Sequence, residues 1–224
     1  MNPMADEPRL IITLDGPAAS GKSSVAKALA RRLGIAYVSS GLLYRAATFL
    51  SLAAGVDPCD EAAVLALLSQ REVRLHPDRH GNRVTVDDDD VTDKLHTDEV
   101  DDAVSDVARH REVRAWVTER LREMHGSFAI DGRDMGTVVF PQARCKFYLT
   151  AAPEVRAARR VGERSADLGT VAAGLRSRDE RDARQSVPAP DAIVIDTGPL
   201  GLDEVVERVL GEVRAASSES VVGA

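Results

Sequence analysis

The sequence of 224 residues has few cysteines, few aromatic residues and no long hydrophobic run. Its two cysteines, Cys59 and Cys145, lack CxxC spacing, so we expect reduced thiols and no disulfide framework. No run of 18 apolar residues is present, which argues against a membrane-spanning helix. The polar residues 1–9 lack the apolar stretch of a signal peptide. These features predict a cytoplasmic protein.

Basic charge is also in deficit, because the formal net charge is −7 at pH 7. This balance disfavours broad nucleic-acid binding. The basic residues that are present are mostly arginine, 25 against 4 lysines. Arginine suits bidentate recognition of phosphate. The length and a hydrophobic content of 44% are typical of one α/β domain with a small insert.

Residues 10–33 contain the most informative motif of the chain. A short apolar run over 10–14 predicts a strand buried on both faces, and a helix is predicted to reach residue 33. Between them stands Gly-x4-Gly-Lys-Ser at 16–23, the P-loop pattern, in which backbone N–H groups and a helix N-terminus surround a phosphate. Lys22 should reach the β/γ-phosphates and the Ser23 hydroxyl should bind Mg²⁺. The predicted ATP-binding residues are Gly16, Pro17, Ala18, Ala19, Ser20, Gly21, Lys22, Ser23, Ser24 and Arg159.

Short strands alternate with helices along the rest of the chain. Further strands are predicted over 35–39, 127–131, 145–150 and 192–196. Helices are predicted over 41–54, 61–70, 97–109, 111–124, from 153 onward, over 170–183 and over 202–215. Ser40 and Asp60 are expected to cap two of them. The alternation predicts an α/β fold with a five-stranded parallel sheet, helices on both faces and ligands at the carboxyl ends of the strands.

Residues 72–97 differ from the rest of the chain in their pattern of apolar and polar residues. Apolar and polar residues alternate from Val73 to Val86 around a turn-rich centre, which predicts a β-hairpin. We interpret this segment as a small antiparallel insert. The expected domain plan is a P-loop core at 9–71 and 98–215 with a helical lid at about 153–184, the β insert at 72–97, and flexible tails at 1–8 and 217–224.

Two groups of residues suit phosphoryl transfer, which needs positioning and positive charge more than covalent chemistry. Asp131 ends an apolar strand and is the expected carboxylate near Mg²⁺, with Asp15 as a second candidate. Arg156, Arg159 and Arg160 precede a loose stretch at 162–169 and suit a lid that excludes water. The alternative for these arginines is a solvated helix face paired with Glu154 and Glu163.

Four segments together resemble the bacterial cytidylate kinase family. They are Gly16-Pro-Ala-Ala-Ser-Gly-Lys22, Ser40-Gly-Leu-Leu-Tyr-Arg45, Asp131-Gly-Arg-Asp-Met-Gly-Thr-Val-Val-Phe-Pro141 and Arg178-Asp-Glu-Arg-Asp182. The resemblance spans about residues 9–215, and the insert is also similar to that of the bacterial enzymes. It implies transfer of the ATP γ-phosphate to CMP or dCMP with Mg²⁺. Apart from the resemblance, we expect a monomer with no membrane or nucleic-acid partner.

The resemblance also implies an acceptor site. Its CMP-binding residues are Ser40, Tyr44, Arg45, Ser105, Arg114, Arg133, Asp134, Arg178, Asp182 and Arg184. The resemblance implies that Ser40, Arg45 and Arg133 contact the acceptor phosphate. It implies that Ser105, Arg114 and Asp134 contact the cytosine, and that Arg178 and Asp182 contact the ribose. The expected catalytic residues are Lys22, Arg133, Arg156, Arg160 and Arg178.

The sequence departs from the family pattern at two positions. Ser39 stands where the family usually has Asp. Gln185 stands where the family commonly has Arg, and Arg184 could fill that role if one residue were deleted. Two other functions stay open from the residues alone. One is a small P-loop kinase with a different acceptor, and the other is a P-loop ATPase that works as a switch.

Overall fold

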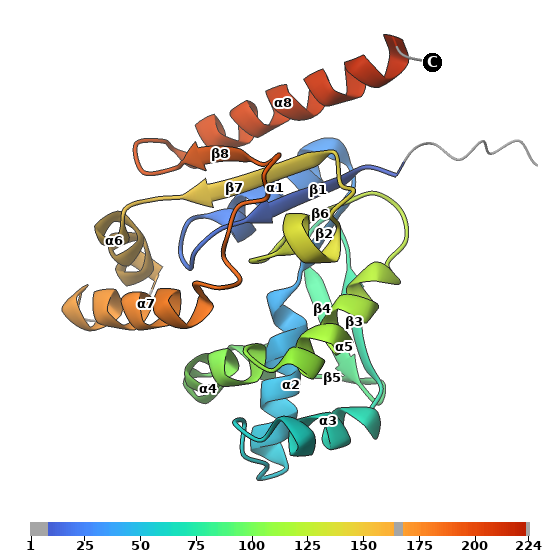
Figure 1. Ribbon diagram of the computed structural model, residues 1–224, viewed down its shortest axis with the longest axis vertical. Helices are drawn as coiled ribbons and strands as arrows, with labels where there is room; N and C mark the ends of the chain where they lie inside the picture. Colours follow the sequence, from blue (N-terminus) through green and yellow to red (C-terminus); the bar gives the residue numbers. More distant parts are fainter. Residues whose placement is uncertain (1–8, 164–167, 223–224) are drawn as a thin grey trace, which may run out of the picture.

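The computed structural model describes residues 9–163 and 168–222. Its centre is a five-stranded parallel sheet with the order β2-β6-β1-β7-β8 (Figure 1). The strands are β1 (Ile11–Asp15), β2 (Ala36–Ser39), β6 (Phe128–Asp131), β7 (Cys145–Thr150) and β8 (Ile193–Asp196). Asp131 at the end of β6 lies beside Leu14 on one side and Ser39 on the other. The predicted α/β class and parallel sheet are confirmed.

Helices α1 (Lys22–Leu33) and α8 (Leu202–Val222) form one apolar layer with the sheet. Val25 and Leu29 of α1 are four residues apart, as are Val205 and Val209 of α8, so each pair presents one helix face to Ile12 and its neighbours. We predicted that α8 ends near residue 215, which is wrong. No glycine or proline interrupts residues 214–222, so the helix continues through most of the expected C-terminal tail.

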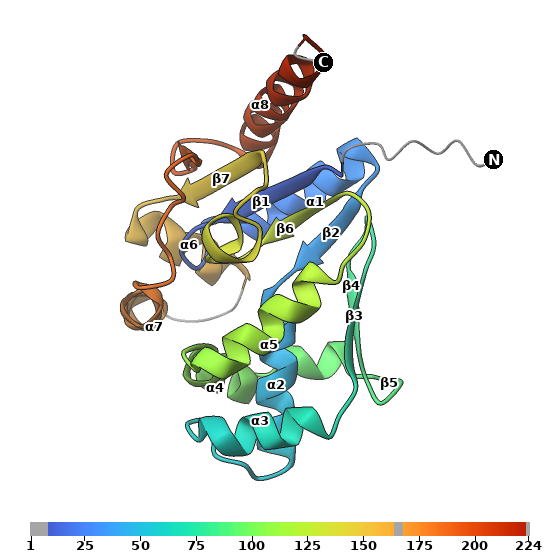
Figure 2. The ribbon, with the colours of Figure 1, turned by 45° about the vertical axis from the view of Figure 1, so that its right-hand side comes forward.

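A second core joins the sheet to a group of helices that extends away from it (Figure 2). The helices are α2 (Gly41–Ala53), α3 (Glu61–Ser69), α4 (Asp98–Ala108) and α5 (Arg111–Arg122). The side chain of Asp60 caps α3 by accepting from the Ala63 N–H at 3.0 Å, as predicted. The short π-helix η2 (Met135–Val139) contributes Met135 to the same core.

The insert is a separate three-stranded antiparallel sheet. Its elements are β3 (Val73–Pro77), β4 (Asn82–Val86), β5 (Asp89–Asp90) and the short 3₁₀ helix η1 (Thr92–His96). Asp78 closes the β3–β4 turn by accepting from the backbone N–H groups of His80 and Gly81, at 2.6 and 2.8 Å. The predicted β insert is therefore present.

Helices α6 (Pro153–Glu163) and α7 (Leu168–Asp182) lie side by side near the carboxyl ends of the strands (Figure 1). We predicted a loose stretch at 162–169. Its first two residues belong to α6 and its last two to α7, whereas 164–167 lie outside the described residues. Residues 1–8 and 223–224, expected as tails, also lie outside them. Within the described ranges, no helix combines the length and apolar character needed to cross a membrane.

Candidate active site

The loop after β1 has the backbone geometry that the P-loop pattern predicts. Gly16 has φ of 141°, and a Cβ there would lie 2.0 Å from the carbonyl oxygen of Leu149. Lys22 begins α1 and folds back over the loop, where its ammonium donates to the Pro17 carbonyl at 2.6 Å. Burial and the nearby Arg133 lower the pKa of Lys22. The lysine is thus buried at the mouth of the loop.

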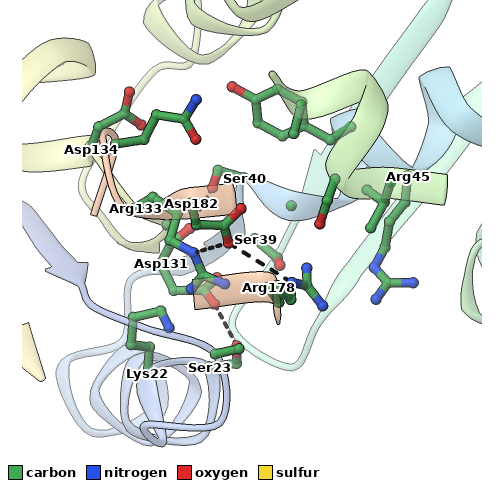
Figure 3. Close-up of a pocket in the computed structure, with 18 of the residues that line it drawn as sticks. Lys22, Ser23, Ser39, Ser40, Arg45, Asp131, Arg133, Asp134, Arg178 and Asp182 are labelled. Atoms are coloured by element: carbon green, nitrogen blue, oxygen red, sulfur yellow. Dashed lines mark hydrogen bonds and ion pairs between the residues drawn. The ribbon is translucent and has the colours of Figure 1, made fainter. Parts of the chain in front are cut away.

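Asp131 and Ser23 meet beside this lysine (Figure 3). The Ser23 hydroxyl donates to one carboxylate oxygen of Asp131, and the Tyr37 hydroxyl donates to the other at 3.2 Å. Serine and carboxylate oxygens are ligands that Mg²⁺ accepts, so this pair fits the ion. Among the described residues, no three His, Cys, Asp or Glu side chains gather as metal ligands. An ion held here would therefore draw most of its ligands from phosphate and water.

Asp15, the second candidate for the carboxylate near Mg²⁺, contacts the loop after β6. Its two carboxylate oxygens accept from the backbone N–H groups of Met135 and Gly136, at 2.9 and 2.8 Å. Burial raises the pKa of Asp15 to about 6. With both oxygens engaged on the loop after β6, Asp15 is not grouped with Ser23 and Asp131.

A cavity of about 250 Å³ lies beyond the P-loop, at the carboxyl ends of β2 and β6. The structure brings nine of the ten predicted CMP-binding residues into its lining, as Figure 3 shows in part. They are Ser40, Tyr44, Arg45, Ser105, Arg114, Arg133, Asp134, Arg178 and Asp182. Lys22, Ser23 and Arg160 line the same cavity. The polar residues that follow separate strands thus converge at one edge of the sheet, as expected.

Most guanidinium groups of this cavity are held by carboxylates. Arg114 pairs with Asp134, Arg45 pairs with Asp101, and the Arg133 Nε donates to Asp182 at 2.9 Å. Each of these single charged contacts orients its arginine before any ligand enters.

Arg178 differs from the other arginines of the cavity. Its Nε is buried, lies 3.9 Å from the Asp182 carboxylate and has no hydrogen-bond partner among the described residues. Burial and, to a lesser extent, the adjacent Arg133 together lower the pKa of Arg178 to about 10. A buried donor without a partner is costly, so this group is poised to bind an anion.

Ser40 was predicted to cap α2, and it does not. Its hydroxyl donates instead to the carbonyl oxygen of Asp131 at 2.7 Å, which draws Ser40 toward the cavity. The Tyr44 ring lies one helical turn further along, with the Arg114 guanidinium 5.7 Å from its centre. Ser105 on α4 is buried against the same space rather than on the helix surface.

The predicted lid arginines make three different contacts. Arg156 is buried, and its guanidinium donates to the Ala18 carbonyl at 3.1 Å and to Asp179 of α7 at 2.6 Å. The solvated-face alternative is therefore wrong for this residue. Arg159 donates to the Thr197 hydroxyl at 3.0 Å. Arg160 lies 3.7 Å from Asp101, across the cavity from α6.

A second cavity of about 630 Å³ lies on the other side of the P-loop. It is lined by residues of the P-loop and the start of α1, of α6, of the connection between β8 and α8, and of the start of α8. They are Ala19, Ser20, Gly21, Lys22, Ser23, Ser24, Val25, Arg159, Arg160, Thr197, Leu200, Gly201, Leu202 and Val205. The two cavities share Ala19, Lys22, Ser23 and Arg160. The P-loop thus stands between two spaces, each large enough to take part of a ligand.

Comparison with known proteins identifies the family. The family model described as cytidylate kinase matches residues 12–215. The chain belongs to the cytidylate kinase family. A cytidylate kinase of Thermus thermophilus is 59% identical over 206 residues, covering 92% of this chain and 99% of the relative. One of Deinococcus radiodurans is 56% identical, covering 91% and 99%, and one of Geobacillus kaustophilus is 45% identical, covering 90% and 95%.

Solved structures agree with this assignment at the level of the fold. A gluconokinase from Sinorhizobium meliloti superimposes with a TM-score of 0.52 at 17% identity, covering 97% of this chain and 98% of the other. An uncharacterized protein from Eubacterium ventriosum gives 0.52 at 14% identity, covering 92% and 99%. The resemblance predicted from the four sequence segments is confirmed by the family match.

At the second departure from the cytidylate kinase pattern, the structure favours Gln185 over Arg184. Gln185 lines the acceptor cavity, whereas Arg184 is exposed and lies outside the lining. The reason is local. Helix α7 ends at Asp182, and the Gln185 N–H donates to the Asp182 carbonyl at 2.9 Å, which turns residue 185 toward the site. Arg184, the tenth residue that the resemblance places at the CMP site, therefore does not line this cavity.

Sequence reasoning missed three residues of this cytidylate kinase site. Tyr37 orients Asp131, Asp101 holds Arg45, and Asp179 holds Arg156. Asp101 could have been found, because it stands four residues before Ser105 and therefore on the same face of α4. Tyr37 carried no local signal, and Asp179 belongs to the quoted segment 178–182 but stands 23 positions from Arg156, so the sequence did not indicate their pairing.

Proposed function

We propose that this protein transfers the γ-phosphate of ATP to CMP and dCMP, giving ADP and the cytidine diphosphates. One observation carries the proposal. A cavity lined by Arg45, Arg133, Arg178 and Asp134 opens beside Lys22 of the P-loop. Membership of the cytidylate kinase family and relatives of that name support the same activity.

The acceptor side suits the chemistry of a cytidine monophosphate. The dianionic phosphate favours guanidinium groups, here Arg45 and Arg133. We expected Arg178 at the ribose, but its buried Nε, which has no hydrogen-bond partner among the described residues, would supply a third donor to the phosphate in this proposal. The amino group of cytosine is a donor that Asp134 accepts, whereas its O2 and N3 are acceptors that suit Arg114. A base with the opposite pattern would leave buried polar groups unpaired, at a cost of several kcal/mol.

The donor side suits ATP. Backbone N–H groups of the P-loop and the ammonium of Lys22 would surround its phosphates. Ser23 and Asp131 would hold Mg²⁺, which offsets negative charge on the phosphates when it is bound. Arg159 lines the second cavity and would contact the ATP side, whereas Arg160 lines both cavities.

Catalysis in this scheme is positioning plus charge stabilisation. Lys22 and Arg160 border both cavities, so they would face the phosphoryl group as it passes from donor to acceptor. Arg156 fixes α6 against the P-loop through the Ala18 carbonyl, and Arg133 reaches the Gly16 carbonyl at 2.7 Å. These contacts would keep water out and align the two phosphates.

A coupled assay of ADP release tests the proposal, with CMP, dCMP, UMP and AMP as acceptors. We expect kcat/KM for CMP and dCMP to exceed the values for UMP and AMP by about 1,000-fold. Equal rates with all four would instead indicate another P-loop kinase acceptor. Hydrolysis of ATP that no acceptor accelerates would indicate a switch ATPase. We also propose that the protein is a cytoplasmic monomer, and light scattering measures its mass.

A further inference from the structure

Asp15 is a buried carboxylate that the transfer of phosphate does not itself require. It ends β1 directly before Gly16, and only 4% of its surface is exposed. Burial raises the pKa of Asp15 to about 6, so its carboxylate is charged at neutral pH. A neutral side chain in the same buried position would cost less free energy. Lys22 and Asp134 are the charged groups that face Asp15. The contacts of this buried charge indicate its role.

The contacts of Asp15 belong to a continuous seam between the P-loop strand and the loop after β6. The Gly132 N–H donates to the Leu14 carbonyl at 3.1 Å, and the Arg133 guanidinium donates to the Gly16 carbonyl at 2.7 Å. Between them, Asp15 accepts from the N–H groups of the two residues that follow Asp134, at 2.9 and 2.8 Å. Three consecutive residues, 14–16, thus hold both flanks of Arg133 and Asp134.

Gly136 makes this close approach possible. A Cβ at Gly136 would lie 2.9 Å from the Thr13 hydroxyl and 3.4 Å from a carboxylate oxygen of Asp15. A side chain there would push the loop away from the strand. The close contact between the loop and Asp15 therefore depends on glycine at residue 136.

We propose that Asp15 is a positioning residue for the acceptor site. Its carboxylate fixes the loop at 132–136 against the P-loop, and so sets where Arg133 and Asp134 stand relative to the donor phosphates. This inference rests on the proposed function, because it gives Asp134 and Arg133 to the acceptor. Asp15 touches neither substrate in this scheme and acts through the loop.

Asp15→Asn is the direct test. An amide has one acceptor oxygen, and its NH₂ group opposes the second backbone N–H, so at least one hydrogen bond to the loop is lost. We expect KM for CMP to rise by about tenfold or more, with KM for ATP within about twofold of the wild type. The unfolding temperature at pH 7.5 should not fall, since a buried charge is removed. A residue with a merely structural role would lower that temperature and leave the two KM values in proportion.

Thr13→Val is the matched control, because Thr13 lies under the same loop on the same strand and its buried hydroxyl has no hydrogen-bond partner among the described residues. Its KM for CMP should stay within about twofold of the wild type. A folded Asp15→Asn variant with unchanged KM for CMP, or with both KM values raised equally, would overturn the proposal. Wild-type protein inactive with CMP would overturn the proposed function instead.

A second route is open if Asp15→Asn does not fold. Gly136→Ala moves the same loop from its other side, and we expect a rise in KM for CMP of about tenfold. Adding Thr13→Ala removes the nearest clashing atom, 2.9 Å from the new Cβ, and should restore part of the loss. A Gly136→Ala variant with wild-type KM for CMP would overturn the proposal by this route.

Discussion

The donor and acceptor sides of the cleft are built in different ways. The donor side rests mainly on one continuous segment, residues 16–24, whose backbone would surround the phosphates, and α6 and the residues after β8 complete its cavity. The acceptor side draws single side chains from five separate places, and carboxylates orient most of its arginines. Those pairs are Arg45 with Asp101, Arg114 with Asp134, and Arg133 with Asp182.

Because of this difference, the two sides are sensitive to different substitutions. Phosphate binding by a backbone loop depends on the conformation of that loop. It is therefore sensitive to substitution of glycines such as Gly16, where an added Cβ would overlap the carbonyl of Leu149. A set of buried ion pairs depends on partners, so removal of one carboxylate leaves an arginine buried without its counter-charge. Side-chain substitutions should therefore separate the two sides through KM for ATP and KM for CMP.

The largest expected effect is at Lys22, where the two sides meet. Lys22→Met keeps most of the buried volume and removes the ammonium that borders both cavities. We expect kcat to fall by about 1,000-fold, with KM for CMP changed by less than about threefold, as measured by steady-state kinetics. Lys27→Met on the same helix is the control. If kcat fell by less than tenfold, the P-loop lysine would not be where the two sides join.

Asp134 comes second and tests the acceptor side alone. Asp134→Ala removes a proposed cytosine contact and leaves Arg114, itself largely buried, without its carboxylate. We expect KM for CMP to rise about 100-fold and kcat to fall, with binding of ATP nearly intact. Calorimetric titration with each nucleotide measures the split. Asp106→Ala, which breaks a more exposed pair with Arg109, is the control. Equal loss of ATP affinity would show that the two sides are not separable here.

The same contrast explains what the sequence could predict. The P-loop was readable because its signal is local, a strand, a glycine pattern and a helix in order. The sheet followed from the alternation of short apolar runs. Most acceptor residues were reached only through resemblance, because Arg45 and Asp101 meet across 56 positions of sequence. No local pattern specifies such a pair.

The errors have physical causes of the same kind. Ser40 has the sequence of a helix cap, but a carbonyl of β6 competes for its hydroxyl. For Arg156 the solvated helix face was the alternative to the predicted lid, and burial against the P-loop and α7 excludes that alternative. The extension of α8 to Val222 was missed because weak helix formers were taken as a tail. Tertiary contacts settled the first two cases, and the absence of a breaker settled the third.

A third prediction concerns Asp15 at the joint between the two sides. Its pKa of about 6 in the folded protein lies above the unfolded value near 4, so the folded state binds this proton more tightly. Stability from this group is complete below about pH 4 and is lost as pH rises through 6. The free energy of unfolding, taken as wild type minus Asp15→Asn, should therefore fall by about 2 kcal/mol from about pH 4.5 to about pH 7.5.

Chemical denaturation at several pH values measures that difference. The subtraction removes the contribution of exposed acids whose pKa is lowered, such as Asp78 and Asp87, since both proteins contain them. If the difference in unfolding free energy between the two proteins did not change over this pH range, Asp15 would not be a buried charge between the two sides.

The smallest expected effect lies at the edge of the acceptor side. Gln185 lines the cavity and would offer one neutral hydrogen bond to the acceptor, whereas Arg184 is exposed. A neutral hydrogen bond is worth about 1 kcal/mol, so Gln185→Ala should raise KM for CMP by about threefold to fivefold, and Arg184→Ala should leave it unchanged. Steady-state kinetics of the two neighbouring variants compare them directly. The reverse order would mean that the turn after α7 presents Arg184 to the bound nucleotide. The acceptor side would then rely on one more charge than the ion pairs described above, and its contrast with the backbone-built donor side would be sharper.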